Sequence, residues 1–229
     1  MLAFIAAERR EFDGLLGKAD RVAELGWPLP FARKAWVKGE AIVLVANGPG
    51  PALAGWAAEV VRKQQELTGL VSTGFCGALN PALEACDIFV ATEVLGLTHA
   101  PKVPRSHSCE CKTGILLSVD RVVSTAIEKA ELRWTGADAV EMEAGAVAAK
   151  AGEWNIPFYC IRVVTDTAGE NFPLDFNRMR AGDGRFSRMK IVAAALGRPG
   201  AVFPELMKLN KRCRDASQAL GNFIVDASF

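Results

Sequence analysis

The sequence lacks a long apolar run and a net charge of either sign. No apolar stretch reaches the roughly 18–20 residues that a membrane-spanning helix needs, although half of the 229 residues are hydrophobic. The 27 lysines and arginines are balanced by 26 aspartates and glutamates, so charge gives no reason to expect DNA or RNA as a partner. The apolar segment 1–7 has no basic leader, and we expect a buried first strand there rather than a signal peptide.

The sequence also lacks a cysteine framework. Four of the six cysteines lie in apolar or helical stretches: Cys76, Cys86, Cys160 and Cys213. A free thiol behaves there as a small hydrophobe, so we expect a reducing, cytoplasmic compartment. One loop holds His99, His107, Cys109 and Cys111. Its Cys-x-Cys spacing, with no second pair, matches structural zinc sites poorly. We therefore expect neither a metal nor a cofactor.

Short apolar strands alternate with helical patterns, with no internal repeat and no low-complexity tract. Strands are predicted at 41–46, 70–73, 88–94, 115–119 and 158–165, and helices at about 52–67 and near 143–153. We expect glycines 74 and 77 to end the strand at 70–73. The pattern predicts one α/β domain over 1–229, with three α/β/α layers and a central mixed, mostly parallel sheet. Residues 197–229 form a C-terminal helical extension in this interpretation.

Polar residues gather at three strand ends, where ligands bind in such sheets. In Ser72-Thr73-Gly74-Phe75-Cys76-Gly77, the glycines allow close approach to a ligand or mark only a tight turn. In Val140-Glu141-Met142-Glu143-Ala144, interaction with a helix dipole also accounts for at least one glutamate. In Arg162-Val163-Val164-Thr165-Asp166, the aspartate stands where α/β enzymes place acids and bases, and a helix N-cap is the alternative.

Taken together and in this order, the three segments resemble the nucleoside phosphorylase/nucleosidase superfamily. The motifs are Thr-Gly-x-x-Gly-x-Leu at 73–79, Val-Glu-Met-Glu-Ala at 140–144 and Arg-x-x-Thr-Asp at 162–166. The resemblance covers most of the chain, from Phe4 to about Glu170, and includes the methylthioadenosine/S-adenosylhomocysteine nucleosidases. It implies a nucleoside phosphorylase-like fold and cleavage of the N-glycosidic bond of a purine nucleoside.

The resemblance also implies catalytic roles. Cleavage of this bond requires protonation of the leaving base, a grip on the sugar and a nucleophile. Asp166 would protonate the purine N7, and Glu143 would accept hydrogen bonds from the ribose 2′- and 3′-hydroxyls. A glutamate just after the first strand would activate water. Glu11 fits this position because the flanking apolar residues then align without a gap, and Glu8 is its rival.

The remaining expected contacts surround the sugar and the base. Met142 would pack against the ribose, and the base would lie beside Val122 and Val123, read by backbone groups. Cys76 and Gly77 would lie on the other side of the base. Two further residues, Phe75 and Glu141, complete the expected substrate-binding set.

The nature of the nucleophile separates two reactions. Phosphorylases of this superfamily usually carry arginine at the position of Ser72 and serine or threonine at that of Phe75, and this sequence has neither. We therefore favour water as the nucleophile, with a purine nucleoside as the small-molecule substrate. Phosphorolysis is the alternative, because Gly48-Pro49-Gly50 has the composition of a phosphate-binding loop. A non-catalytic nucleoside-binding protein is a third hypothesis, against which the joint presence of Glu11, Glu143 and Asp166 argues.

Shorter motifs refine the resemblance. Leu117-Ser118-Val119-Asp120-Arg121-Val122-Val123 and Arg198-Pro199-Gly200 resemble the hopanoid-associated subgroup, which implies removal of adenine from adenosylhopane. The loop between Val94 and Gly114 and the link from Val123 to Glu141 are short, so we expect a pocket that is open at the ribose 5′ end.

The tail at 203–223 has apolar residues at helical spacing among four basic residues. We expect a helix docked on the domain or on a second subunit, and the alternative is an amphipathic helix on a membrane surface. The resemblance and the high hydrophobic fraction lead us to expect at least a dimer.

Overall fold

The computed structural model describes residues 1–97, 99–106, 108–172, 174–182, 184–185 and 199–229. Nine strands of this part of the chain form one sheet: β1 (Leu2–Ala6), β2 (Arg21–Glu24), β3 (Phe31–Val37), β4 (Glu40–Ala46), β5 (Gly69–Ala78), β6 (Ile88–Val94), β8 (Lys112–Ser118), β9 (Ala139–Glu141) and β10 (Phe158–Asp166). Two short strands, β7 (Arg105–Ser106) and β11 (Ala227–Ser228), pair with each other. The helices are η1 (Arg9–Phe12), α1 (Asp13–Leu16), α2 (Pro51–Gln64), α3 (Ala126–Arg133), α4 (Ala144–Glu153), η2 (Phe176–Met179) and α6 (Pro199–Asp226).

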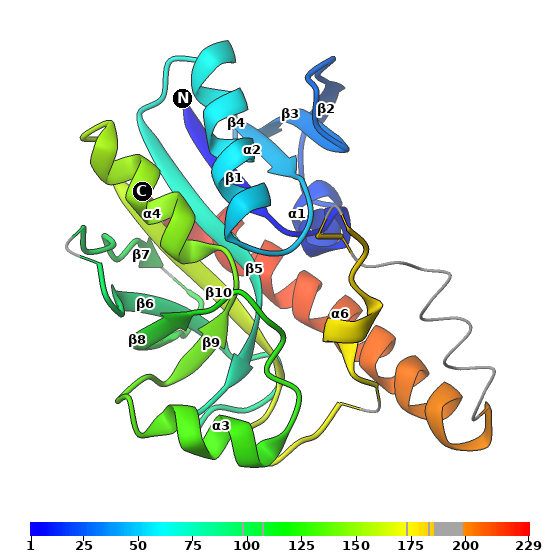
Figure 1. The fold of residues 1–229 in the computed structure, drawn as a ribbon. Coiled ribbons are helices and arrows are strands. Elements are labelled where there is room, and N and C mark those ends of the chain that lie inside the picture. Colours follow the sequence, from blue (N-terminus) through cyan, green and yellow to red (C-terminus); the bar gives the residue numbers. More distant parts are fainter. Residues whose placement is uncertain (98, 107, 173, 183, 186–198) are drawn as a thin grey trace.

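The sheet is mixed and partly closed on itself. Its strand order is β10-β6-β8-β9-β5-β1-β4-β3-β2, and β10 pairs with β5 as well, so that β5, β9, β8, β6 and β10 form a ring (Figure 1). Central strand β1 runs parallel to β4 and β5, and β5 runs parallel to β10. The register sets Gly77 beside both Asp166 and Val140. The ends of three chain segments therefore meet at one place.

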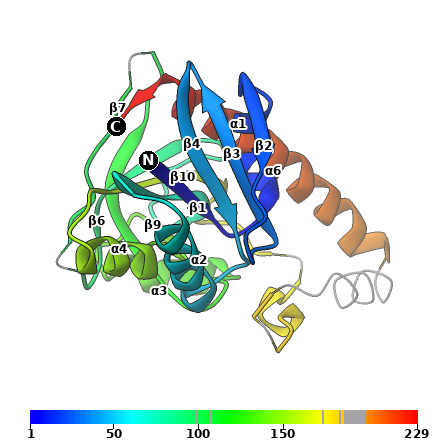
Figure 2. The same cartoon turned by 90° about the horizontal axis from the view of Figure 1, so that it is seen from above.

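Helices cover the sheet on both faces, as the expected three-layer α/β/α arrangement requires. Helices α2 and α4 lie on one face, and α1 and α6 lie on the other (Figure 2). A separate apolar cluster fills each interface; Phe89 and Phe158 belong to the first, and Phe12 and Phe223 belong to the second. Apolar side chains project from both faces of the central strands. The sequences of these strands are therefore nearly continuous hydrophobic runs.

Some expected elements have different limits. The prediction that Gly74 and Gly77 end a strand was wrong, because β5 continues through both to Ala78. Gly74 adopts a φ of +133° and still pairs with Arg162 of β10, so the glycine changes the course of the strand without breaking its ladder. Strands β2 and β3 and helix α3 were not expected, because exposed polar residues interrupt their apolar patterns.

The C-terminal helix α6 has two different halves. Its second half docks on the domain, with Cys213, Leu220 and Phe223 buried. In its first half, Phe203 and Met207 remain 58% and 60% exposed. No helix in the described ranges combines the length and hydropathy needed to cross a membrane. Of the expected extension, 197 and 198 lie outside the described residues.

Candidate active site

One cavity of about 1000 Å³ brings together every residue that the sequence placed at the site. The ten residues are Glu11, Phe75, Cys76, Gly77, Val122, Val123, Glu141, Met142, Glu143 and Asp166. They come from η1, the end of β5, the loop before α3, the junction of β9 and α4, and the end of β10. The structure thus gathers side chains that are up to 155 positions apart in the sequence (from 11 to 166).

Glu11 follows β1 on the 3-10 turn η1 and is 5% exposed. The backbone N–H of Phe75 donates to its Oε1 at 2.8 Å, and the N–H of Glu8 donates to its Oε2 at 2.6 Å. Burial raises the pKa of the Glu11 carboxyl above its ordinary value. The rival Glu8 also reaches the cavity, but its carboxylate pairs with Arg10 at 2.6 Å and is partly exposed. The geometry therefore sets Glu11, rather than Glu8, deepest in the cavity.

Arg162 of β10 is fully buried and contacts the carboxylates of Glu141 and Glu143. Its guanidinium pairs with Glu141 and lies 3.6 Å from Oε2 of Glu143. It also donates to the Ser72 hydroxyl at 2.5 Å and to the Thr73 carbonyl at 3.1 Å. A buried cation with so many acceptors offsets much of the cost of burying several carboxylates in one place.

Glu141 and Glu143 have different surroundings. Glu141 accepts hydrogen bonds from the backbone N–H groups of Glu143 and Ala144, so its carboxylate caps the start of α4 besides pairing with Arg162. Glu143 accepts a single backbone bond, from Gly50 at 2.9 Å. Burial, with the nearby Glu141 charge, raises the pKa of Glu143 to about 8. Of the two, Glu143 has more acceptor capacity left for a ligand.

Asp166 ends β10 at an irregularity of the ladder and is 5% exposed. The Thr165 hydroxyl lies 2.9 Å from its Oδ1, and Nζ of Lys129 lies 2.6 Å from its Oδ2. Burial raises the pKa of Asp166 above its ordinary value, against the opposing effect of the Lys129 charge. A Cβ atom on Gly77 would lie 2.8 Å from Oδ2, so any side chain at this position would crowd the oxygen.

The two valines of the loop before α3 differ in what they offer a base. The side-chain amide of Asn177 donates to the Val122 carbonyl and accepts from the Val122 N–H, each at 2.8 Å. Val123 is buried, and its backbone groups form no hydrogen bond within the described ranges. The backbone groups that remain for a ligand are therefore those of Val123, and those of Val122 are already satisfied.

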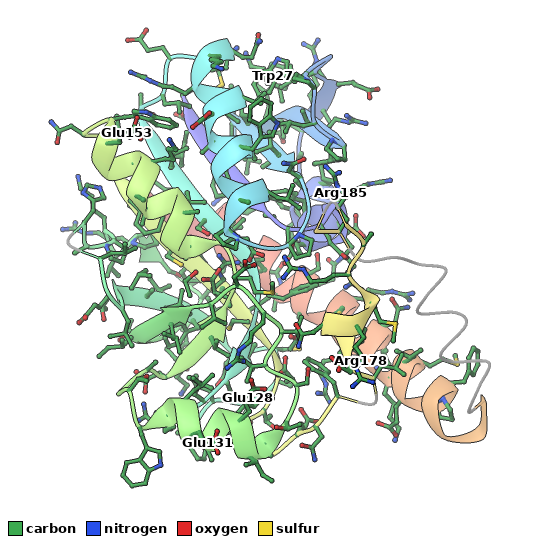
Figure 3. All side chains as sticks on the ribbon, viewed as in Figure 1. Trp27, Glu128, Glu131, Glu153, Arg178 and Arg185 are labelled. Carbon is green, nitrogen blue, oxygen red and sulfur yellow. The ribbon has the colours of Figure 1, made fainter. Side chains whose placement is uncertain are left out.

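Described residues between 171 and 185 lie along the cavity and were not expected there. Phe172, Phe176 and Arg185 line the cavity. Arg185, which Figure 3 labels, donates to the Asn47 carbonyl at 3.1 Å, and Arg180 pairs with Asp120 at 3.2 Å. These contacts tie the two arginines to the loop after β4 and to the loop after β8. From α6, Leu206 and Leu209 add apolar surface.

The donors that a phosphate nucleophile would need are largely engaged. The Gly48 N–H donates to the Ala7 carbonyl at 2.8 Å, and the Gly50 N–H donates to Glu143. The residue at the position where phosphorylases carry arginine is Ser72, which accepts from Arg162. The 48–50 loop therefore offers little to an anion.

Sequence reasoning missed several residues of this site, above all Lys129, and gave Arg162 no role of its own. Neither Lys129 nor Asn177 belongs to a motif, and the helix that carries Lys129 was not expected. Of the four residues of the loop that was weighed as a zinc site and set aside, His107 lies outside the described residues. The described ranges contain no group of three or more His, Cys, Asp or Glu residues that could hold a metal ion.

Known proteins resemble this chain in both sequence and fold. A family model described as the phosphorylase superfamily matches residues 100–185. The chain is 24% identical to the 5′-methylthioadenosine/S-adenosylhomocysteine nucleosidase of Halalkalibacterium halodurans, over 72% of this chain and 84% of that protein. It is 25% identical to the aminodeoxyfutalosine nucleosidase of Campylobacter jejuni, over 66% and 78% of the two chains.

These matches support a likeness to the phosphorylase superfamily. Its fold matches that of the methylthioadenosine/S-adenosylhomocysteine nucleosidase of Neisseria meningitidis in complex with methylthio-immucillin-A, with a TM-score of 0.71, 20% identity and coverage of 98% and 96%. The corresponding Campylobacter jejuni structure gives a TM-score of 0.70 at 19% identity, over 98% and 96% of the chains. The expected fold is thereby confirmed, and the sequence matches support the expected superfamily.

Proposed function

We propose that this chain is a nucleosidase that hydrolyses the bond between adenine and ribose in a nucleoside with a bulky 5′ substituent. The observation that carries the proposal is the convergence of Glu11, Glu143 and Asp166, all at most 5% exposed, in one cavity. Two relatives that share most of their length with this chain are named nucleosidases. A protein that only binds nucleosides has no need for an acid beside the base.

Asp166 is the proton donor in this proposal. As the C1′–N9 bond breaks, negative charge develops on the departing base, and a proton on N7 neutralises it. Asp166 lines the cavity, and its Oδ2 lies beside Gly77, whose lack of a side chain leaves space for the edge of a purine. Burial favours the protonated carboxyl, and the backbone of Val123 reads the opposite part of the base.

Glu143 and Glu11 act on the sugar and on water. Glu143 accepts the ribose 2′- and 3′-hydroxyls, and Met142 beside it packs against the ring. Charge-assisted hydrogen bonds of this kind are about twice as strong as neutral ones. Glu11 accepts one backbone N–H on each oxygen, so each oxygen keeps a lone pair with which to orient and deprotonate the attacking water.

Water is the nucleophile that this cavity favours. The backbone amides of the 48–50 loop are bonded within the protein, and Arg162 is occupied by carboxylates and by Ser72. A phosphate ion would have to displace these contacts. Phosphorolysis and nucleoside binding without turnover remain the competing functions to be tested.

The cavity volume supports a large 5′ substituent. About 1000 Å³ is at the upper end of the roughly 300–1,000 Å³ usual for ligand sites. Leu206, Leu209 and Phe176 supply apolar surface along its wall. An adenosine carrying a lipidic group such as that of adenosylhopane matches this surface, in agreement with the motifs of the hopanoid-associated subgroup.

A panel of nucleosides tests the proposal. Methylthioadenosine, adenosine, inosine and a 5′-alkyl-extended adenosine are incubated with the protein, with and without inorganic phosphate, and the free base is quantified. We expect adenine release that is independent of phosphate. In water enriched in ¹⁸O, the label should enter the ribose product at C1′. Release that requires phosphate would identify a phosphorylase, and the absence of release from every nucleoside would leave the binding protein.

A further inference from the structure

Helix α3 buries a charged side chain while part of its apolar surface is exposed. Ile127 is 75% exposed and Trp134, just after the helix, is 92% exposed, whereas Lys129 is 1% exposed and is the buried residue of the helix. Leu132 is only partly buried, against the small apolar cluster around Val123 and Val140. Burying an ammonium group costs free energy unless it is paired and fully hydrogen-bonded. A helix that serves only to cover the domain would bury apolar residues rather than a lysine. The burial of Lys129 therefore indicates that its charge has a task.

The surroundings of Lys129 fit an ammonium group. Nζ donates to Oδ2 of Asp166 at 2.6 Å, to the Thr167 carbonyl at 2.7 Å and to the Glu170 carbonyl at 3.3 Å. It also lies 5.7 Å from the centre of the Phe172 ring. Three acceptors and a ring face use all three N–H bonds of the cation. A neutral amine would have only two N–H donors for the three acceptors.

Lys129 contacts two residues of the cavity lining, Asp166 and Phe172, and its ion pair is with Asp166. It is absent from the described lining of the cavity, whereas Asp166 is part of it. The two contacts of the Asp166 carboxyl divide its oxygens: Thr165 lies against Oδ1, and Lys129 lies against Oδ2, the oxygen that also faces the open side of Gly77. The ammonium therefore stands behind the atom that faces the base.

The other charged groups around Asp166 pair with each other, and the remaining titratable groups near it are thiols. Glu170 accepts from Arg212 of α6 at 2.7 and 2.9 Å, and Arg212 also donates to the Thr165 carbonyl at 3.0 Å. The thiols facing Asp166 are Cys76 from β5 and Cys213 from α6, and burial raises the pKa of both. Lys129 is the cation in direct contact with the carboxyl.

We propose that Lys129 is a positioning residue for proton transfer, which orients Asp166 and stabilises the carboxylate that Asp166 becomes when its proton moves to N7 of the base. The proposal rests on the proposed nucleosidase function. In this step the O–H bond of Asp166 breaks, the N7–H bond forms, and the C1′–N9 electron pair stays with the leaving base. Lys129 keeps its three protons throughout and pairs with the new carboxylate at once.

The test is a double-mutant cycle on kcat and on the pH profile of kcat/KM, with Lys129→Met, Asp166→Asn and the double variant. Removing the cation raises the pKa of Asp166, so the acid stays protonated to higher pH but becomes weaker. We expect Lys129→Met to lose at least about tenfold in kcat, the lower part of the range for acid–base catalysis, and its alkaline limb to move up by about 1 pH unit or more. In the Asp166→Asn background the same substitution should cost less than about twofold.

Two further variants separate charge from packing. Lys129→Arg keeps the charge and should recover much of kcat and return the limb toward its wild-type position. Lys129→Gln carries no charge but still donates hydrogen bonds to the backbone carbonyls, and it makes the same test if Lys129→Met does not fold. Lys150→Met is the matched control. Lys150 of α4 pairs with Glu59 of α2 at 2.7 Å and is not among the residues described as lining the cavity. The pH profile of kcat/KM of this variant should be that of the wild type.

A purely structural lysine would give other results. If the neutral Lys129 variants keep the wild-type limb, or if their loss in kcat persists in the Asp166→Asn background, the proposal is wrong. Failure of the underlying function looks different: the wild type would release no base, or Asp166→Asn would be as active as the wild type, whatever the Lys129 variants do.

Discussion

The Glu11 carboxyl occupies the space that a side chain at Gly74 would need. A Cβ atom built on Gly74 would lie 2.8 Å from Cδ of Glu11 and closer still to its Oε1. Gly74 also adopts a φ of +133°, where side chains are rarely tolerated. The residue that would activate water and the glycine of the motif are therefore one structural unit, joined by the Phe75 N–H.

Replacing Gly74 by alanine should displace Glu11 and reduce base release at least about a hundredfold, because a 1 Å misplacement of a reacting group can cost about that much. Steady-state kinetics on adenosine measure it. Gly39→Ala is the matched control: its φ is +82°, yet its Cβ would meet nothing within 4 Å, so it carries backbone strain without the contact. Equal losses in both variants would mean that strain, not Glu11, explains the effect.

The affinity for ribosides should rise with pH. Glu143 has a pKa of about 8 because it is buried beside Glu141, and it accepts the ribose hydroxyls best as a carboxylate. Binding must then displace a proton below pH 8, so affinity should increase by up to about tenfold per pH unit from pH 6 to 8 and level off above. Calorimetry with a C-nucleoside analogue of adenosine, whose bond resists hydrolysis, measures this.

Free adenine has no ribose hydroxyls and should bind with little pH dependence. Glu143→Gln should abolish the dependence for the riboside and leave adenine affinity nearly unchanged, and Glu153→Gln, at the end of α4, is the control. A Glu143→Gln variant that weakens adenine and riboside equally would contradict the sugar role.

Much of the fold can be predicted from the sequence, because the pattern that marks the central strands is contained in short stretches of the chain. Helices cover both faces of the central strands, so these strands are largely apolar, as at 41–46, 88–94 and 158–165. This pattern can be recognised in the sequence without knowledge of the tertiary structure. By contrast, strand β5 was predicted to end at Gly74, because glycine is a turn signal in sequence. In the structure, Gly74 keeps a φ above zero inside the ladder, where it pairs with Arg162 of β10.

The chemistry is only partly visible in sequence. The motifs brought Glu11, Glu143 and Asp166 forward, and one cavity contains them all. Lys129 carried no signal, because its partner Asp166 is 37 positions away and its helix reads as polar. The bond between Asn177 and Val122 likewise spans 55 positions. Such long-range polar pairs arise from the fold and leave no periodic pattern.

A further prediction concerns the group at the 5′ end of the substrate. If Leu206, Leu209 and Phe176 bind an apolar 5′ group, a 5′-alkyl-extended adenosine should have a higher kcat/KM than methylthioadenosine. Each buried methylene contributes about 0.8 kcal/mol, and part of this energy can be expressed in the transition state. Leu206→Ser should reduce the difference while changing methylthioadenosine turnover little. A clear preference of the wild type for methylthioadenosine would contradict the proposal.

Assembly is a separate prediction. Large apolar side chains are exposed on α3 and on the first half of α6, among them Trp134, Phe203 and Met207, and symmetric dimers commonly cover such surface. We expect at least a dimer by multi-angle light scattering at micromolar concentration, with and without a nucleoside. A single species with the mass of one chain in both conditions would contradict this.

Base release by Asp166→Asn tests the central claim most directly. The amide keeps the size of the carboxyl but has no proton to give to N7, so we expect a loss of at least about a hundredfold in kcat, the usual scale for general acid catalysis. Asp20→Asn, in the turn before β2, serves as the control, and adenine binding by the Asp166 variant verifies that its site is intact. A kcat near that of the wild type in Asp166→Asn would remove Asp166 from the mechanism and contradict this account of the site.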